Sequence, residues 1–248
     1  MVSACGFTVL LEHPSSPLRM SLASAELRRF LAGLAMGATA ILLIYSPLGQ
    51  RSGAHMNPVI TLTFFRLGKV ARWDAVFYVL AQFLGAILGV LAFYAVMRGA
   101  LADRQVNYAI TLPGARGEAA AFAGEATISF LLMIVVLYLS NSGKHARFTG
   151  IAAGILLMLF ITFESPLSGM SMNPARSFAS DLVGMQWQGL WIYFLAPLIG
   201  MLAAAELFVR TRGLHSIRCA KLNHSGNARC IFRCGYMITP AETATSGD

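Results

Sequence analysis

The chain has 248 residues, of which 56% are hydrophobic and only 12% are charged, whereas a soluble domain carries about 25% charged residues. Its net charge of +8 is spread between apolar segments, which argues against a nucleic-acid-binding protein and for a multi-pass membrane protein. No nucleophile paired with a general base and no phosphate-binding loop is found, so the chain is not expected to be an enzyme.

Apolar segments follow one another along the chain. The first, MVSACGFTVLL (1–11), is too short to cross a bilayer, which takes about 20 residues, and it lacks the charged start of a signal peptide. Five later segments approach the required length and are predicted to be membrane helices: Phe30–Leu48, Ala75–Met97, Ala119–Ser140, Phe148–Phe163 and Leu190–Val209.

A short motif occurs twice, as SGAHMNPVITL (52–62) and SGMSMNPARSF (168–178). Three further pairs of matches keep the same order around it. They are GLAMG (33–37) with GIAAG (150–154), Ser46-Pro47-Leu48 with Ser165-Pro166-Leu167, and Tyr78-x-Leu80-Ala81-x-x-x-Gly85 with Tyr193-x-Leu195-Ala196-x-x-x-Gly200. Four matches in sequence predict two related halves.

Each half is expected to hold three spans, with residues 1–11 standing where the first span of the first half ends. An odd number of spans turns the second half upside down, which is the inverted-repeat plan of many transport proteins. We therefore predict a first repeat at 1–97, an extracytoplasmic connection at 98–118, a second repeat at 119–210 and a basic, Cys/His-containing cytoplasmic tail at 211–248. The segments assigned to the cytoplasm (51–72, 144–147 and 210–233) hold twelve Lys and Arg against six outside, with Arg176 left out of the count. This excess agrees with the positive-inside rule.

Asn-Pro suits the start of a helix, because Asn caps the first turn and Pro fits the first helical position. The motifs predict half-helices at 57–65 and 173–182, whose positive N-terminal ends meet near the bilayer centre and repel cations and protons. A single Asn-Pro would more simply be an ordinary turn; two copies in related halves favour the half-helices.

These motifs resemble the paired pore motifs of the aquaporin (major intrinsic protein) family. LGKVARWDAVFYVLAQFLGAILG (67–89), AGEATISFLLMIVVLYL (123–139) and WIYFLAPLIGMLAAAELF (191–208) are also similar. The resemblance implies an all-α transmembrane fold: a right-handed, aquaporin-like inverted-repeat bundle of six spans, the first incomplete here, with two half-helices meeting at the Asn-Pro motifs. It also implies a homotetramer with one pore per subunit.

Carried over by position, the pore motifs are Asn57-Pro58-Val59 and Asn173-Pro174-Ala175. The selectivity filter would consist of Gly37, Ile161, Met170 and Arg176. Water-selective members place His and a bulky aromatic residue where this chain has Ile161 and Gly37, so the resemblance implies a wider, less polar filter. Arg176 could instead be a structural arginine, paired with Asp181.

Two positions depart from the family pattern. Val59 replaces the usual alanine and adds two methyl groups where the half-helices meet. The glutamate that the family carries near the start of its first helix would fall at about residue 2 or earlier, where none is found, so we expect a shortened first helix, through truncation or a start codon assigned too far downstream. Its second-half counterpart, Glu125, could couple protons or accept hydrogen bonds from the pore loop; the resemblance favours the structural role. His55 is expected to be a hydrogen-bonded loop residue.

The tail offers Cys219, His224, Cys230 and Cys234, a set of ligand types that suits Zn²⁺, although the spacing matches no zinc signature. Disulfides or a plain reduced tail are alternatives, and residues 238–248 are expected to be disordered. No other cofactor is expected.

The sequence thus predicts a passive channel for water or small neutral solutes such as glycerol, urea or metalloid acids. It would lie in the cell membrane (the inner membrane of a bacterium), in contact with lipid and without nucleic-acid partners. A proton- or ion-coupled transporter and a metal-responsive membrane protein are the alternatives.

Overall fold

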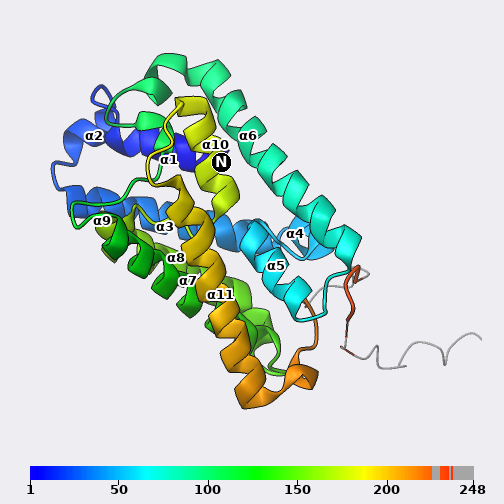
Figure 1. Ribbon diagram of the computed structural model, residues 1–248. Coiled ribbons are helices and arrows are strands. Elements are labelled where there is room, and N and C mark those ends of the chain that lie inside the picture. Colours follow the sequence, from blue (N-terminus) through cyan, green and yellow to red (C-terminus); the bar gives the residue numbers. More distant parts are fainter. Residues whose placement is uncertain (225–229, 235, 237–248) are drawn as a thin grey trace, which may run out of the picture.

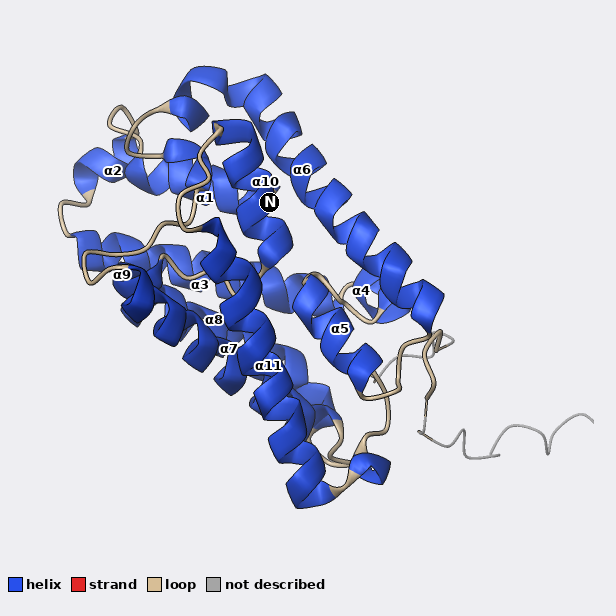
Figure 2. Ribbon diagram, in the orientation of Figure 1, coloured by secondary structure: helices blue, strands red, loops and turns tan. Residues whose placement is uncertain are grey.

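The structure is a computed structural model that describes residues 1–224, 230–234 and 236, and those residues form helices and loops without a strand. Figure 2 shows this all-helical composition. The first half contains α1 (Val2–Glu12), α2 (Pro17–Ser21), α3 (Ala25–Tyr45), α4 (Pro47–Ser52), α5 (Pro58–Arg66) and α6 (Arg72–Ala102). The second half contains α7 (Glu118–Ser140), α8 (Thr149–Phe163), α9 (Ser165–Ser168), α10 (Pro174–Gly184) and α11 (Leu190–Arg212). Three short 3-10 turns lie at Asn107–Ala109, Ala146–Phe148 and Leu214–Ser216.

Five helices of the described part of the chain are long and apolar enough to cross a membrane: α3, α6, α7, α8 with its preceding turn, and α11. They coincide with the five predicted spans, and the all-helical fold is confirmed. The bounds differ most in α3 and α6, each by five residues at one end and three at the other. Helix α3 begins at Ala25 because the Ser24 hydroxyl caps it, accepting the Leu27 N–H at 3.2 Å. It ends at Tyr45, where Ser46 and Pro47 start the separate helix α4.

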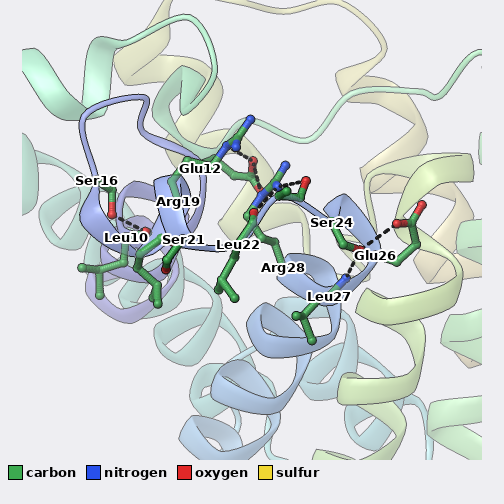
Figure 3. Close-up of polar contacts among 12 residues, drawn as sticks. Leu10, Glu12, Ser16, Arg19, Ser21, Leu22, Ser24, Glu26, Leu27 and Arg28 are labelled. Atoms are coloured by element: carbon green, nitrogen blue, oxygen red, sulfur yellow. Dashed lines mark hydrogen bonds and ion pairs between the residues drawn. The ribbon is translucent and has the colours of Figure 1, made fainter.

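The 11-residue helix α1 packs against both α3 and α6. A buried arginine holds the connection from α1 to α3 (Figure 3): Arg28 Nε donates to both carboxylate oxygens of Glu12 at 3.2 Å. Its Nη1 donates to the carbonyls of Leu22 at 2.8 Å and Ala23 at 3.0 Å. These bonds engage Nε and Nη1 of the guanidinium and fix the start of α3 relative to α1.

The two halves meet where α3 crosses α8, at the GLAMG and GIAAG matches. A Cβ atom on Gly37 would lie 2.5 Å from the Gly154 carbonyl oxygen, and one on Gly154 would lie 2.7 Å from the Gly37 oxygen. The contact is reciprocal between equivalent residues, as expected where a two-fold axis relates two units. Glycine at both positions allows the helix backbones to touch, which is a common way of packing helices in lipid.

The outer surface of the bundle is strongly apolar. In α6, which forms one edge of the molecule in Figure 1, only 6% of the apolar window is buried, against 50% in α11, which packs on α7. Leu80, Leu84 and Leu88 are among the exposed side chains of α6. A face of this kind suits lipid or another apolar surface.

Candidate functional site

The two Asn-Pro motifs each begin a half-helix, as predicted. The Asn57 Oδ1 atom caps α5 by accepting the Val59 N–H at 2.9 Å. Asn173 Oδ1 caps α10 by accepting the N–H groups of Ala175 at 3.1 Å and Arg176 at 3.3 Å. Pro58 and Pro174 occupy the first helical positions and are buried. Each side-chain oxygen therefore satisfies backbone donors that a helix start leaves unpaired.

The side-chain amides tie the two motifs together. Asn57 Nδ2 donates to the Met172 carbonyl at 2.6 Å, and Asn173 Nδ2 donates to the Met56 carbonyl at 2.9 Å. Each acceptor is the residue directly before the opposite asparagine, so the arrangement repeats the two-fold relation of the glycine crossing. An asparagine amide has two N–H donors, and the bond across the motifs uses one of them.

Val59, which departs from the family pattern, lies in the apolar core and is 1% exposed. Ala175, its counterpart in the second motif, is equally buried at 1%. The larger side chain is thus accommodated by packing around α5.

The carboxylate of Glu125, from α7, accepts three hydrogen bonds from the second pore loop, which leads from the end of α9 to the start of α10 (residues 168–173). Oε1 accepts the Ser171 N–H at 2.6 Å and the Ser168 hydroxyl at 2.9 Å, and Oε2 accepts the Met172 N–H at 2.7 Å. The same loop contains two non-glycine residues with positive φ, Met170 and Met172, both at 55°. The carboxylate therefore supports a backbone conformation that is otherwise costly.

Arg176 leaves α10 toward the connection between the halves, where its Nη1 donates to the Thr111 hydroxyl oxygen. Thr111 is 1% exposed and also accepts a hydrogen bond from Ser177 Oγ at 3.3 Å. No ion pair within 4.0 Å joins Arg176 to Asp181 or to another carboxylate in the part of the chain that the structure describes. Sequence reasoning missed Thr111, because an isolated threonine in a loop gives no signal of this contact.

The four residues predicted for the filter do not share one environment. Ile161 and Met170 belong to the same apolar cluster, Ile161 partly buried and Met170 7% exposed. Gly37 is different: it is buried against Gly154 in the crossing of α3 and α8. Its assignment to the filter, which follows from counting residues back from Asn57, stays a prediction.

His55 is a hydrogen-bonded loop residue, as expected, and it connects the pore loop to the tail. Its Nε2 lies 2.7 Å from the Ala220 carbonyl, which can only accept, so Nε2 carries the proton. Nδ1 then accepts from the Thr61 hydroxyl at 3.2 Å, and Thr61 Oγ1 accepts from Gln82 Nε2 at 3.0 Å. Gln82 Nε2 also donates to the His55 carbonyl at 2.6 Å.

The structure brings the four predicted tail ligands together. One ligand atom from each of Cys219, His224, Cys230 and Cys234 lies within 4.8 Å of all the others. Burial raises the pKa of the Cys219 thiol and lowers the pKa of the His224 imidazole. The tail residues predicted to be disordered, 238–248, lie outside the described residues.

A family model described as Major intrinsic protein matches residues 5–208 of the chain. Among curated proteins, Aquaporin NIP1-4 of Oryza sativa subsp. japonica is 36% identical over 173 residues, which are 69% of this chain and 61% of that protein. Nodulin-26 of Glycine max is 32% identical over 173 residues, 69% of this chain and 62% of the relative. The chain thus spans about three fifths of the length of these plant proteins.

A shorter relative is covered more fully. The probable aquaporin AqpM of Archaeoglobus fulgidus is 35% identical over 186 residues, 72% of this chain and 75% of that protein. Among solved structures, the aquaglyceroporin from Plasmodium falciparum superposes with a TM-score of 0.67 at 18% identity, covering 84% of this chain and 89% of that one. At this identity the superposition supports the fold alone.

Proposed function

The chain belongs to the major intrinsic protein family, and from this premise we propose that it is a passive transmembrane channel for water and small neutral solutes. The observation that carries the proposal is the reciprocal pair of hydrogen bonds from Asn57 to the Met172 carbonyl and from Asn173 to the Met56 carbonyl. These bonds hold two helix N-termini against each other in the middle of a membrane bundle.

This geometry suits permeation of neutral molecules. Each asparagine has a second N–H that can donate to the oxygen of a passing solute. The N-termini of α5 and α10 carry partial positive charge, which opposes the entry of cations and protons. Water and uncharged hydroxyl compounds meet no such barrier.

We propose small polyols, urea-like molecules or uncharged metalloid acids as permeants besides water. Ile161 and Met170 supply apolar side chains, and Arg176 supplies a donor anchored at Thr111. Such a lining matches a solute with carbon on one side and hydroxyls on the other better than a strictly polar filter would. This argument depends on the filter residues of the second half and not on Gly37.

The coupled-transporter alternative would need a carboxylate free to exchange protons near the bilayer centre. Glu125 accepts three hydrogen bonds from loop donors, and protonation would disrupt at least one of them. The structural role for Glu125 therefore fits the contacts better.

We further propose that the chain lies in the cell membrane, assembles as a homotetramer through apolar outer faces such as that of α6, and keeps its C-terminal tail in the cytoplasm. The excess of Lys and Arg on the tail side supports this orientation.

Stopped-flow swelling of proteoliposomes with water, glycerol, urea and a metalloid acid tests the channel proposal. We expect permeability above that of empty liposomes for water and at least one solute. Equal values for protein-containing and empty liposomes would contradict it.

Arg176→Ala tests the filter in the same assay. We expect it to reduce discrimination among the solutes, because it removes the charged donor. Arg116→Ala is the matched control, since Arg116 is exposed in the loop before α7. Unchanged permeability to every solute in Arg176→Ala would count against the filter assignment.

A further inference from the structure

The strongest feature outside the pore is the cluster of three cysteines and one histidine in the tail, which we call the Cys₃His cluster (Cys219, His224, Cys230 and Cys234). The Cys219 and Cys230 sulfurs are 3.4 Å apart, and His224 Nε2 is 3.0 Å from the Cys234 sulfur. All four ligand atoms lie within 4.8 Å of one another. Four side chains from separate points of the tail thus converge on one small volume.

These spacings fit a tetrahedral metal ion. A Zn–S bond of about 2.3 Å with tetrahedral angles places neighbouring sulfurs about 3.8 Å apart, inside the range observed. The cysteines are unpaired, and the separation of the Cys219 and Cys230 sulfurs is well beyond a disulfide bond of about 2.0 Å. Three thiolates and an imidazole favour zinc over oxygen-preferring cations such as Mg²⁺ or Ca²⁺.

The surroundings support a site with a net negative charge, as three thiolates around Zn²⁺ would have. The Lys221 N–H lies 3.5 Å from the Cys219 sulfur, where it can donate to a thiolate. The His224 ring stacks on Tyr236, with ring centroids 4.5 Å apart. The Arg218 guanidinium lies over the Tyr236 ring, 5.3 Å from its centroid. A positive charge is therefore close to the cluster.

The tail residues between the ligands contact the first pore loop, which connects α4 to α5 (residues 53–57). Ala220 accepts from His55, and the Leu222 N–H donates to the Gly53 carbonyl at 3.2 Å. Phe232 is 8% exposed and stacks on the His55 ring with centroids 5.2 Å apart.

This docking is close and extends past the C-terminal end of α5. A Cβ atom on Gly53 would lie 2.3 Å from the Phe232 ring, and the Arg233 N–H donates to the Lys69 carbonyl at 3.1 Å. The residues that contact the first pore loop thus alternate along the tail with the four ligands. An ion that binds the ligands would therefore also hold the tail on the loop that leads to Asn57.

We propose that the Cys₃His cluster binds one Zn²⁺ ion and that this ion fastens the tail to the loop preceding the first Asn-Pro motif. The proposal is independent of what the pore conducts. The contacts between the tail and the first pore loop would then depend on the metal, because removal of the ion would release Ala220 and Phe232 from His55 together.

The test uses the full-length protein purified in detergent. Metal analysis is expected to give one zinc per chain, and Co²⁺ in its place is expected to give the intense visible bands of a tetrahedral thiolate site. Cys230→Ser should reduce the bound zinc at least severalfold after dialysis, whereas Cys5→Ser, the matched control in α1, should retain it. Equal zinc in the two variants, or a Cys219–Cys230 disulfide without zinc, would overturn the site.

Docking has its own readout. Trypsin cleavage in the tail, at Arg218, Lys221 or Arg233, should accelerate by about tenfold or more when a chelator removes zinc from the wild-type protein, because metal binding supplies much of the free energy that orders small Cys/His modules. Gel filtration before and after chelation shows whether the membrane domain stays intact. Zinc removal with unchanged cleavage would overturn the fastening role.

Discussion

Gly37→Ala is a sharp test of the packing between the two halves. The added Cβ atom would lie 2.5 Å from the Gly154 carbonyl oxygen and 3.3 Å from the Met158 Cβ atom. The first contact is with backbone, which no side-chain rotation can relieve, so α3 and α8 must separate locally. Overpacking of this kind typically costs about 1–3 kcal/mol.

The matched control is Gly85→Ala. Gly85 is also within a membrane helix, but nothing lies within 4 Å of the Cβ atom that it would gain. Both substitutions gain the helix propensity of alanine over glycine, about 1 kcal/mol, so the difference between the variants isolates the overpacking. For a chain of this size, about 1–3 kcal/mol corresponds to roughly 2–12 °C in apparent melting temperature.

The assay is thermal unfolding of both variants in the same detergent, followed by intrinsic fluorescence or loss of the folded peak in gel filtration. We expect Gly37→Ala to melt several degrees below Gly85→Ala. Equal melting temperatures would refute the close crossing of α3 and α8.

Three further substitutions test single contacts. Glu125→Gln replaces an acceptor oxygen with an NH₂ group that faces loop donors, so at least one hydrogen bond to a charged group is lost. We expect the free energy of unfolding to fall by about 2–4 kcal/mol, seen as a lower melting temperature and reduced permeability. Thr111→Val removes the acceptor for Arg176 and should change the ratio of glycerol to water permeability by about tenfold, the equivalent of about 1.4 kcal/mol. Phe232→Ala should leave zinc bound but speed tryptic cleavage of the tail, because it removes docking and no ligand.

Each of these has a control. Glu206→Gln alters a surface ion pair with Arg66 (2.8 Å) and should leave permeability unchanged, while Thr127→Val removes a hydroxyl that bonds only within α7 and should keep the wild-type solute ratio. A Glu125→Gln protein that transports and melts like the wild type would contradict the loop-supporting role. Loss of zinc from Phe232→Ala would show that docking and metal binding are not separable.

Much of the architecture is predictable from local pattern. Spans such as 119–140 follow from apolar length alone, and the half-helices follow from the chemistry of Asn57-Pro58 and Asn173-Pro174, because a cap and a proline act within one turn. The repeat of GLAMG and GIAAG also signals the two-fold relation, although not that Gly37 and Gly154 touch.

The omissions concern contacts between residues far apart in the chain. Counting residues from Asn57 predicts Gly37 for the filter but does not reveal its contact with Gly154 where α3 crosses α8. The bond from Arg176 to Thr111 joins positions far apart in sequence, and no periodicity links them. The sequence likewise does not predict the stacking of Phe232 on His55, because this contact depends on how the tail folds back over the first pore loop.

The most direct test of passive conduction is uptake of labelled glycerol, with water swelling in parallel, into proteoliposomes that carry an imposed proton gradient. Passive conduction predicts that every permeant equilibrates to equal concentrations on the two sides, at a rate that the proton gradient does not change. Accumulation of a solute above its outside concentration, driven by the proton gradient, would contradict the channel.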